Sequence, residues 1–204
     1  MLEIDNENHL RLLSIDPGTD TVGVAINSVD LEQGQLHVLE TVLLNGGKRL
    51  RFDSYYQYLE EIHGARHARI SVLGECLYKE LQAFQPHDVV CESPFVGKRM
   101  TSAFEALVQV IHAFRSVLYR YDPFLSLELI APMKAKEAVN QARSDVKKED
   151  IRTAVEKISK SPQKSKIYFS DEVDIHQISE HEIDAIVIAY ARFRHWLKVL
   201  KRDC

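Results

Sequence analysis

"LLSIDPGTDTVGVAI", residues 12–26, places an aspartate and a Pro-Gly turn between two stretches that have the composition of buried β-strands. Apolar residues dominate both ends of this segment, and the "DPGTD" between them has the residue types of a tight turn. The segment therefore predicts a strand, a turn and an antiparallel return strand. It also places the carboxylate of Asp16 at the point where the first strand ends.

The rest of the chain divides into β-rich and helical stretches. A meander of three antiparallel strands is predicted over residues 9–15, 21–27 and 35–44. Further on, we expect helical structure over 54–84, a buried strand over 88–92, a long helix over 101–121, a fifth strand over 125–131, a basic helical region over 133–160, a loop or small hairpin over 161–179 and an amphipathic helix over 179–200.

This order of elements predicts an α/β fold, namely a five-stranded mixed sheet with helices on both faces. Ligand sites in such sheets lie near strand ends. Asp16 ends the first predicted strand, and Glu92 ends the fourth, "DVVCE". The two carboxylates are therefore the first candidates for a functional site.

Composition indicates a compact single domain over residues 1–204 and restricts the partners. The chain has 204 residues, a net charge of −4 and no apolar run long enough for a membrane span or a signal peptide. We therefore expect it in the cytoplasm. Three unpatterned cysteines argue against a disulfide framework and a thiolate zinc site. Basic residues gather locally, as in "GGKRLR" (46–51), in a pattern that basic loops around a metal-binding carboxylate cluster would give.

The predicted helix over 101–121 has two apolar faces. Such a helix needs two packing partners, and a second subunit is a candidate for one of them. The first face holds Phe104, Leu107, Ile111, Phe114 and Leu118, and the second holds Ala103, Ala106, Val110, Ala113 and Val117.

Three families begin with a segment similar to residues 12–26. One is the group of actin, Hsp70 and sugar-kinase ATPases, but these need a second Asp-x-Gly loop, and Asp16 is the only aspartate here with glycine two residues later. Another is the group of YqgF-type RNA-processing nucleases, whose later signature loops this chain lacks. The third is the RuvC family of Holliday-junction resolvases, and here the resemblance continues along the chain.

Three later blocks resemble RuvC segments in the same order. "ESPFVGKRMTSAFEAL" is similar to the segment that opens the family's dimer helix, with Glu92, Phe95 and Lys98 in register. "APMKAKEAVNQARSDVKKEDI" is similar to a basic segment and places Lys136 and Lys148 on its two basic positions. "HEIDAIVIAYA" is similar to the closing helix of the family.

The resemblance implies a ribonuclease-H-like fold, a homodimer packed through helix 101–121 and cleavage of branched DNA such as the four-way junction. The chain departs from the family pattern at His181, where most members carry aspartate. It also carries apparent insertions around 45–66 and 158–179. With these departures the chain resembles a divergent or phage-type member of the family, which we expect in a bacterial or phage-infected cell.

The chemistry of phosphodiester hydrolysis supports a metal site built from the same residues. Two Mg²⁺ ions about 4 Å apart would serve the attacking and the leaving oxygen, and such cations need oxygen ligands from several chain segments. The predicted ligands, which are also the predicted catalytic residues, are Asp16, Glu92, His181 and Asp184. Residues three apart share a helix face, as His181 and Asp184 do, and an imidazole ligand would favour substitution by Mn²⁺. Glu180 is an alternative ligand.

Four further residues are predicted to contact DNA, and one more to act in catalysis. Cations are unfavourable in the first turn of a helix, so a phosphate partner explains Lys147 and Lys148 better than helix stability does. We assign Lys148 to the scissile phosphate or the leaving group, and Lys136, Lys98 and Lys147 to DNA binding. Phe95 is a candidate to insert between unstacked bases at a branch point.

The candidate metal site and the resemblance to the RuvC family together predict a metal-dependent endonuclease that cuts Holliday junctions or other branched DNA in recombination and repair. Two other readings stay open, namely a non-catalytic nucleic-acid-binding module of the same fold and a YqgF-type RNA-processing nuclease.

Overall fold

The computed structural model describes residues 9–95, 101–141, 148–161 and 166–200, with only the backbone at residues 101 and 148. These ranges contain the strands β1 (His9–Asp16), β2 (Thr21–Asp30), β3 (Gln35–Asn45), β4 (Asp88–Glu92), β5 (Leu127–Ile130) and β6 (Lys166–Phe169). All six form one mixed sheet in the order β5-β4-β1-β2-β3-β6.

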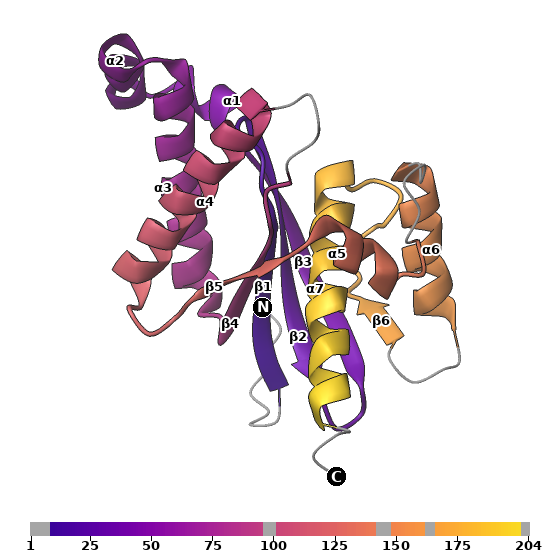
Figure 1. Ribbon diagram of the computed structural model, residues 1–204. Helices are drawn as coiled ribbons and strands as arrows, with labels where there is room; N and C mark the ends of the chain where they lie inside the picture. Colours follow the sequence, from indigo (N-terminus) through magenta and orange to yellow (C-terminus); the bar gives the residue numbers. More distant parts are fainter. Residues whose placement is uncertain (1–8, 96–100, 142–147, 162–165, 201–204) are drawn as a thin grey trace.

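Helices cover both faces of this sheet. They are α1 (Gly46–Leu50), α2 (Ser54–His63), α3 (Ala65–Phe84), α4 (Thr101–Tyr121), α5 (Pro132–Ala138), α6 (Lys148–Lys160) and α7 (Glu180–Leu200). Figure 1 shows α3 and α4 along one side of the sheet and α5, α6 and α7 along the other. The predicted α/β class and the helices on both faces are confirmed. None of the helices in the described ranges has the length and apolarity that crossing a membrane requires.

Alternation along β1 builds a separate core on each side of the sheet. Leu12 is fully buried in a cluster with Ile186 of α7, whereas Leu13 is fully buried in a cluster with Leu77 of α3. Successive side chains of a strand point to opposite faces, so a run of adjacent apolar residues is what a sheet covered on both faces requires. The apolar strands predicted from the sequence therefore form a sheet that is the middle of three layers, with helices on each side.

The opening segment forms the predicted hairpin. β1 and β2 pair antiparallel with Asp16 opposite Gly23, and β2 pairs antiparallel with β3. The turn between β1 and β2 is tight, because a Cβ on Gly18 would lie 2.1 Å from the carbonyl oxygen of Thr21. β4 pairs parallel to β1, so the ends of these two strands, at Asp16 and Glu92, lie at the same edge of the sheet.

The prediction of five strands is wrong, because the chain adds a sixth strand within residues 158–179. β6 pairs parallel to β3. In this register Lys166 lies opposite Gln35, and Phe169 lies opposite Val38. Ile167 is fully buried, and the hydroxyl of Ser170 donates to the carbonyl of Leu39. A four-residue strand between polar segments is too short to show an alternating pattern in the sequence.

Two predicted helical stretches are each divided. Residues 54–84 are helical as expected, but Gly64, with φ of 85°, separates α2 from α3. The basic region over 133–160 consists of α5 and α6, with residues 142–147 outside the described ranges. The expected insertion over 45–66 is occupied by α1, α2 and the beginning of α3.

Candidate active site

Asp16 and His181 meet where β1 ends and α7 begins. The Nδ1 atom of His181 lies 2.7 Å from Oδ2 of Asp16. Asp16 is largely buried, with 7% of its surface exposed, whereas the His181 side chain is 40% exposed. Part of the imidazole ring is therefore accessible to solvent while its Nδ1 atom is held by the carboxylate.

The first turn of α7 is fixed to the sheet by a reciprocal cap. The hydroxyl of Ser179 accepts from the backbone N–H of Glu182, and the carboxylate of Glu182 accepts from the backbone N–H of Ser179 at 2.7 Å. This reciprocal pair is a capping box, in which Ser179 is the N-cap of α7. The hydroxyl of Thr41 on β3 donates to the other Glu182 oxygen at 2.8 Å. Glu182 therefore orients the helix that carries His181.

Gly23 lets α7 approach the sheet closely enough for this contact. A Cβ at Gly23 would lie 2.1 Å from the carbonyl oxygen of His181, which is backbone and cannot swing aside. Gly23 is also the β2 residue paired with Asp16. One glycine therefore determines how near the backbone of His181 comes to the strand end that carries Asp16.

Glu92 lies in the electrostatic field of the other predicted carboxylates. Burial raises its pKa to about 7, and the charges of Asp16 and Asp184 add to the rise, while Lys136 opposes it. Burial, followed by the charges of Asp16 and Glu92, also raises the pKa of the Cys91 thiol well above its ordinary value. Three carboxylates and a lysine from β1, β4, α7 and α5 therefore share one region at the edge of the sheet.

The donor set of this region fits a hard divalent cation. Carboxylate oxygens from three separate elements are the ligands that Mg²⁺ prefers, and the rise in the pKa of Glu92 reflects a repulsion that a bound cation would relieve. Among the described side chains, however, no three His, Cys, Asp or Glu groups stand in a ready metal-binding arrangement. Instead, His181 is turned onto Asp16.

Two of the four predicted DNA-contacting residues lie among the described side chains. Phe95 lies just beyond β4 and is 67% exposed, and Lys136 is half-buried on α5, where its charge acts on Glu92. Lys98 and Lys147 lie outside the described residues. Lys148 is the first residue of α6, described for its backbone alone. Glu180 is exposed and lines a small cavity together with Asp184.

Two positioning residues were missed in reading the sequence. Glu182 is not among the predicted site residues, although the spacing of Ser179 and Glu182 is the Ser-x-x-Glu pattern of a capping box. Gly23 carries a weaker signal, because a glycine within a strand often marks the close approach of another backbone but does not identify which segment approaches.

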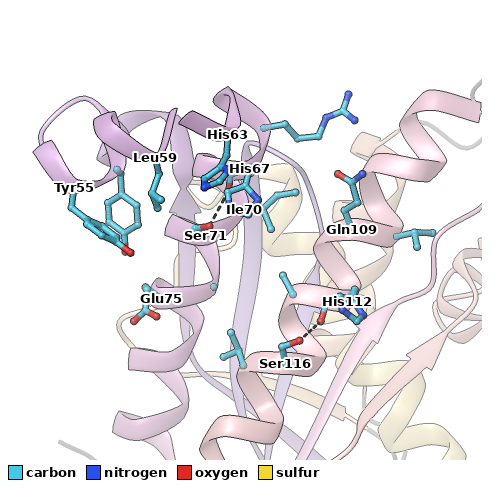
Figure 2. Close-up of a pocket in the computed structure, with 16 residues that line it drawn as sticks. Tyr55, Leu59, His63, His67, Ile70, Ser71, Glu75, Gln109, His112 and Ser116 are labelled. Carbon is cyan, nitrogen blue, oxygen red and sulfur yellow. Dashed lines mark hydrogen bonds between the residues drawn. The ribbon is translucent and has the colours of Figure 1, made fainter. Parts of the chain in front are cut away.

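A large cavity lies away from these carboxylates. It has a volume of about 1060 Å³ and opens between α2, α3 and α4. Figure 2 shows Tyr55 and Leu59 on one side of it and Gln109, His112 and Ser116 of α4 on the other. Because it contains none of the predicted ligands, we assign it no part in the chemistry.

The sheet order and the helices on both faces define a ribonuclease-H-like fold of the RuvC type, as comparison with solved structures shows. RuvC from Thermus thermophilus in complex with a Holliday junction substrate aligns over 93% of this chain and 96% of its own, with a TM-score of 0.62 and 17% identity. The sequence matches no protein-family model and no curated protein.

Two further resolvase structures share the fold. The yeast mitochondrial Holliday junction resolvase Ydc2 aligns over 96% of this chain and 85% of its own, with a TM-score of 0.63 and 13% identity. The fowlpox virus resolvase, solved with substrate Holliday junction DNA, aligns over 94% and 99%, with a TM-score of 0.51 and 12% identity. The chain is therefore similar in fold to resolvases of bacterial, mitochondrial and viral origin.

Proposed function

We propose that this chain is a metal-dependent endodeoxyribonuclease that cuts Holliday junctions or other branched DNA in recombination or repair. The observation that carries the proposal is the contact between Asp16 and His181 beside Glu92, whose pKa is raised to about 7. A carboxyl group whose pKa is raised this far by burial and by neighbouring carboxylates, as that of Glu92 is, is typical of a functional site. The likeness in fold to resolvases solved with Holliday junctions supports the choice of substrate.

In the proposed mechanism, each residue has a defined task. Asp16, Glu92, His181 and Asp184 would hold two Mg²⁺, or Mn²⁺ in their place. These ions would supply a water-derived nucleophile and stabilise charge on the leaving oxygen. The Nδ1 contact with Asp16 holds the His181 ring in orientation, as carboxylates do for ligating imidazoles. Glu92 must lose its proton to act as a metal ligand, and the positive charge of Lys136 favours that loss.

The basic and aromatic residues around the carboxylates would place the DNA. Lys148, in the first turn of α6, would face the scissile phosphate or the leaving group. Lys136 would contact the backbone near Glu92, with Lys98 and Lys147 as further DNA-binding positions. Phe95 is 67% exposed just after the strand that ends in Glu92, where it could stack on an unpaired base.

A homodimer through helix 101–121 completes the proposal, because symmetric cutting of a four-way junction needs two sites related by a two-fold axis. Within one chain, much of both predicted apolar faces of α4 is already buried, including Val110, Ile111 and Phe114. A second subunit could contact the outer side of α4, where Val108 is 41% exposed, and the adjoining cavity in Figure 2.

A nicking assay tests the proposed activity. A synthetic four-way junction should be cut by the wild type in Mg²⁺ or Mn²⁺, and Asp16→Asn should bind the junction without cutting it. The Asn side chain keeps the shape but removes the charge that a cation and His181 would meet. A wild type that binds the junction but never cuts it in either metal would leave only a non-catalytic module. Cutting confined to RNA would favour the RNA-processing alternative.

A further inference from the structure

The short helix α1 is firmly anchored to the strand ends near the candidate active site. The backbone N–H of Gly46 donates to the carbonyl of Asp20, which lies in the β1–β2 turn that follows Asp16. The side chain of Asn45 caps α1 by accepting from the N–H of Lys48 at 2.7 Å, and Leu50 is buried. The segment that follows α1 is therefore displayed from a fixed base.

Phe52 projects from this base into solvent. It lies between α1 and α2 and is 83% exposed, in contrast to Leu50 two residues earlier, which is 7% exposed. Aromatic side chains normally gain stability by burial, so folding gives no reason for a phenylalanine here. Neighbouring Arg51 is exposed as well.

A basic cavity lies beside Phe52. Its volume is about 700 Å³, and its lining includes the cations Lys48, Arg51 and Arg69 together with Asp20 and Glu60. Arg69 is paired with Asp20 at 3.3 Å. Within the described part of the chain, Lys48 and Arg51 enter no ion pair. The cavity therefore offers two cations to an outside anion.

The cavity and Phe95 lie on opposite sides of Asp16 along the same edge of the sheet. Phe95 follows β4, the neighbour of β1 on one side, whereas α1 follows β3, which lies two strands away on the other. Two strand spacings amount to about 10 Å, a distance that a DNA strand covers within a few nucleotides. In Figure 1, α1 lies at the sheet end where β3 finishes.

We propose that Lys48, Arg51 and Phe52 form a second DNA contact, in which the two cations hold backbone phosphates and Phe52 stacks on an unpaired base near the branch. An exposed aromatic ring beside unpaired cations is the combination that binds single-stranded nucleic acid. Apart from Leu50, Phe52 and the small residues, the cavity is lined by polar and charged side chains, which fits a phosphate backbone better than an apolar protein surface. This inference rests on the proposed function.

Junction binding measured apart from cleavage tests it. Asp16→Asn serves as the background, so that a labelled four-way junction stays intact in Mg²⁺ while affinity is measured over a range of salt. Adding Lys48→Gln and Arg51→Gln should lower the slope of log K against log salt by about 2, because each phosphate contact contributes about 0.9. Adding Phe52→Ala should weaken junction binding by about tenfold and leave duplex binding nearly unchanged.

Matched controls come from the far end of the molecule. Phe124→Ala removes a phenylalanine that is 95% exposed in the turn before β5, and Lys79→Gln removes an exposed lysine on α3. Both should keep the affinity and the salt slope of the background protein.

Two results would overturn the inference. Affinity and salt slope in the Lys48, Arg51 and Phe52 variants equal to those of the background protein would do so while leaving the nuclease proposal intact. A background protein that binds no junction would instead defeat the proposed function. If the variants change the sedimenting mass but not junction binding, the surface formed by Lys48, Arg51 and Phe52 is a protein contact and the inference is wrong.

Discussion

His181 Nδ1 lies 2.7 Å from Asp16 Oδ2, and this contact joins residues 165 positions apart in the chain. It connects the end of the first strand to the first turn of the last helix. The candidate active site therefore exists only when both termini of the fold are in place. Local sequence shows each residue at the end of its own element, but only the packing of α7 on the sheet brings the two together.

Gly23→Ala should separate the two residues of this contact. The added Cβ would meet the carbonyl of His181 at 2.1 Å, so α7 has to shift. We expect the free energy of unfolding to fall by about 1–3 kcal/mol, as overpacking typically costs, and junction cleavage to fall more steeply than junction binding. Gly74→Ala is the control, because its Cβ would meet only a Val117 methyl at 3.3 Å. Urea unfolding would measure both variants, and equal stabilities would contradict the predicted clash.

Glu92→Gln should stabilise the metal-free protein at alkaline pH. The pKa of Glu92 is raised from 4.5 to about 7, so the folded state holds a proton that the unfolded state releases. This group therefore favours folding fully below about pH 4.5, and the contribution is lost as pH rises through 7. Gln copies the protonated form, and we expect a gain of about 2–3 kcal/mol at pH 8 and little at pH 4.5. Thermal unfolding in EDTA at both pH values would measure it; a gain independent of pH would argue against the shift.

His37 should make stability fall in mild acid. Burial lowers its pKa, nearby His9 lowers it further, and Asp30 partly opposes them. A histidine with a depressed pKa binds fewer protons in the folded state, so stability declines as pH falls below the unfolded value of about 6.5. His37→Phe keeps the stacking on Tyr168, whose ring centroid lies 4.9 Å away, and should reduce this decline. Urea unfolding at pH 8 and 5.5 would compare it with His67→Phe on the surface of α3. A decline of unchanged size would rule out His37 as its source.

His181→Asp should alter the pH profile of cleavage. An imidazole must be neutral to bind a cation, so wild-type activity should fall steeply below roughly pH 6.5. An aspartate at this position remains charged well below that pH and should give a shallower fall. The variant should also favour Mg²⁺ over Mn²⁺ more than the wild type does, because imidazole favours the later metals. Initial cleavage rates across pH in each metal would decide, and superimposable profiles would remove His181 from the ligand set.

Val108→Arg should dissociate the proposed dimer. Val108 is 41% exposed on the outer side of α4, where a new charge would be buried against a partner. Sedimentation velocity should show a dimer for the wild type and a monomer for the variant. Val199→Arg is the matched control, since Val199 is 42% exposed near the end of α7. A monomeric wild type, or equal masses in all three proteins, would count against this interface.

The sequence predicted those parts of the fold whose signals are local. Apolar runs ended by a carboxylate located β1 and β4 and, with them, Asp16 and Glu92. The spacing of His181 and Asp184 placed both in the first turns of one helix, where the structure has them.

The remainder depends on contacts between distant segments. β6 is a strand because β3 offers it an edge, and its four residues carry no pattern of their own. Gly23 matters because the backbone of His181 approaches it, and Arg49 donates to the buried Cys76 thiol at 2.7 Å, a pairing that no spacing indicates. Such features appear only once the register of the sheet and the position of α7 are known.

Both margins of the sheet end in strands of only four residues, β5 at one edge and β6 at the other. A long bare edge invites another chain to add a strand, which is a common route to aggregation, and a very short edge strand offers few free backbone groups for that pairing. Growth into fibrils by edge-to-edge pairing is therefore disfavoured at either margin, and self-association is left to the helical layers.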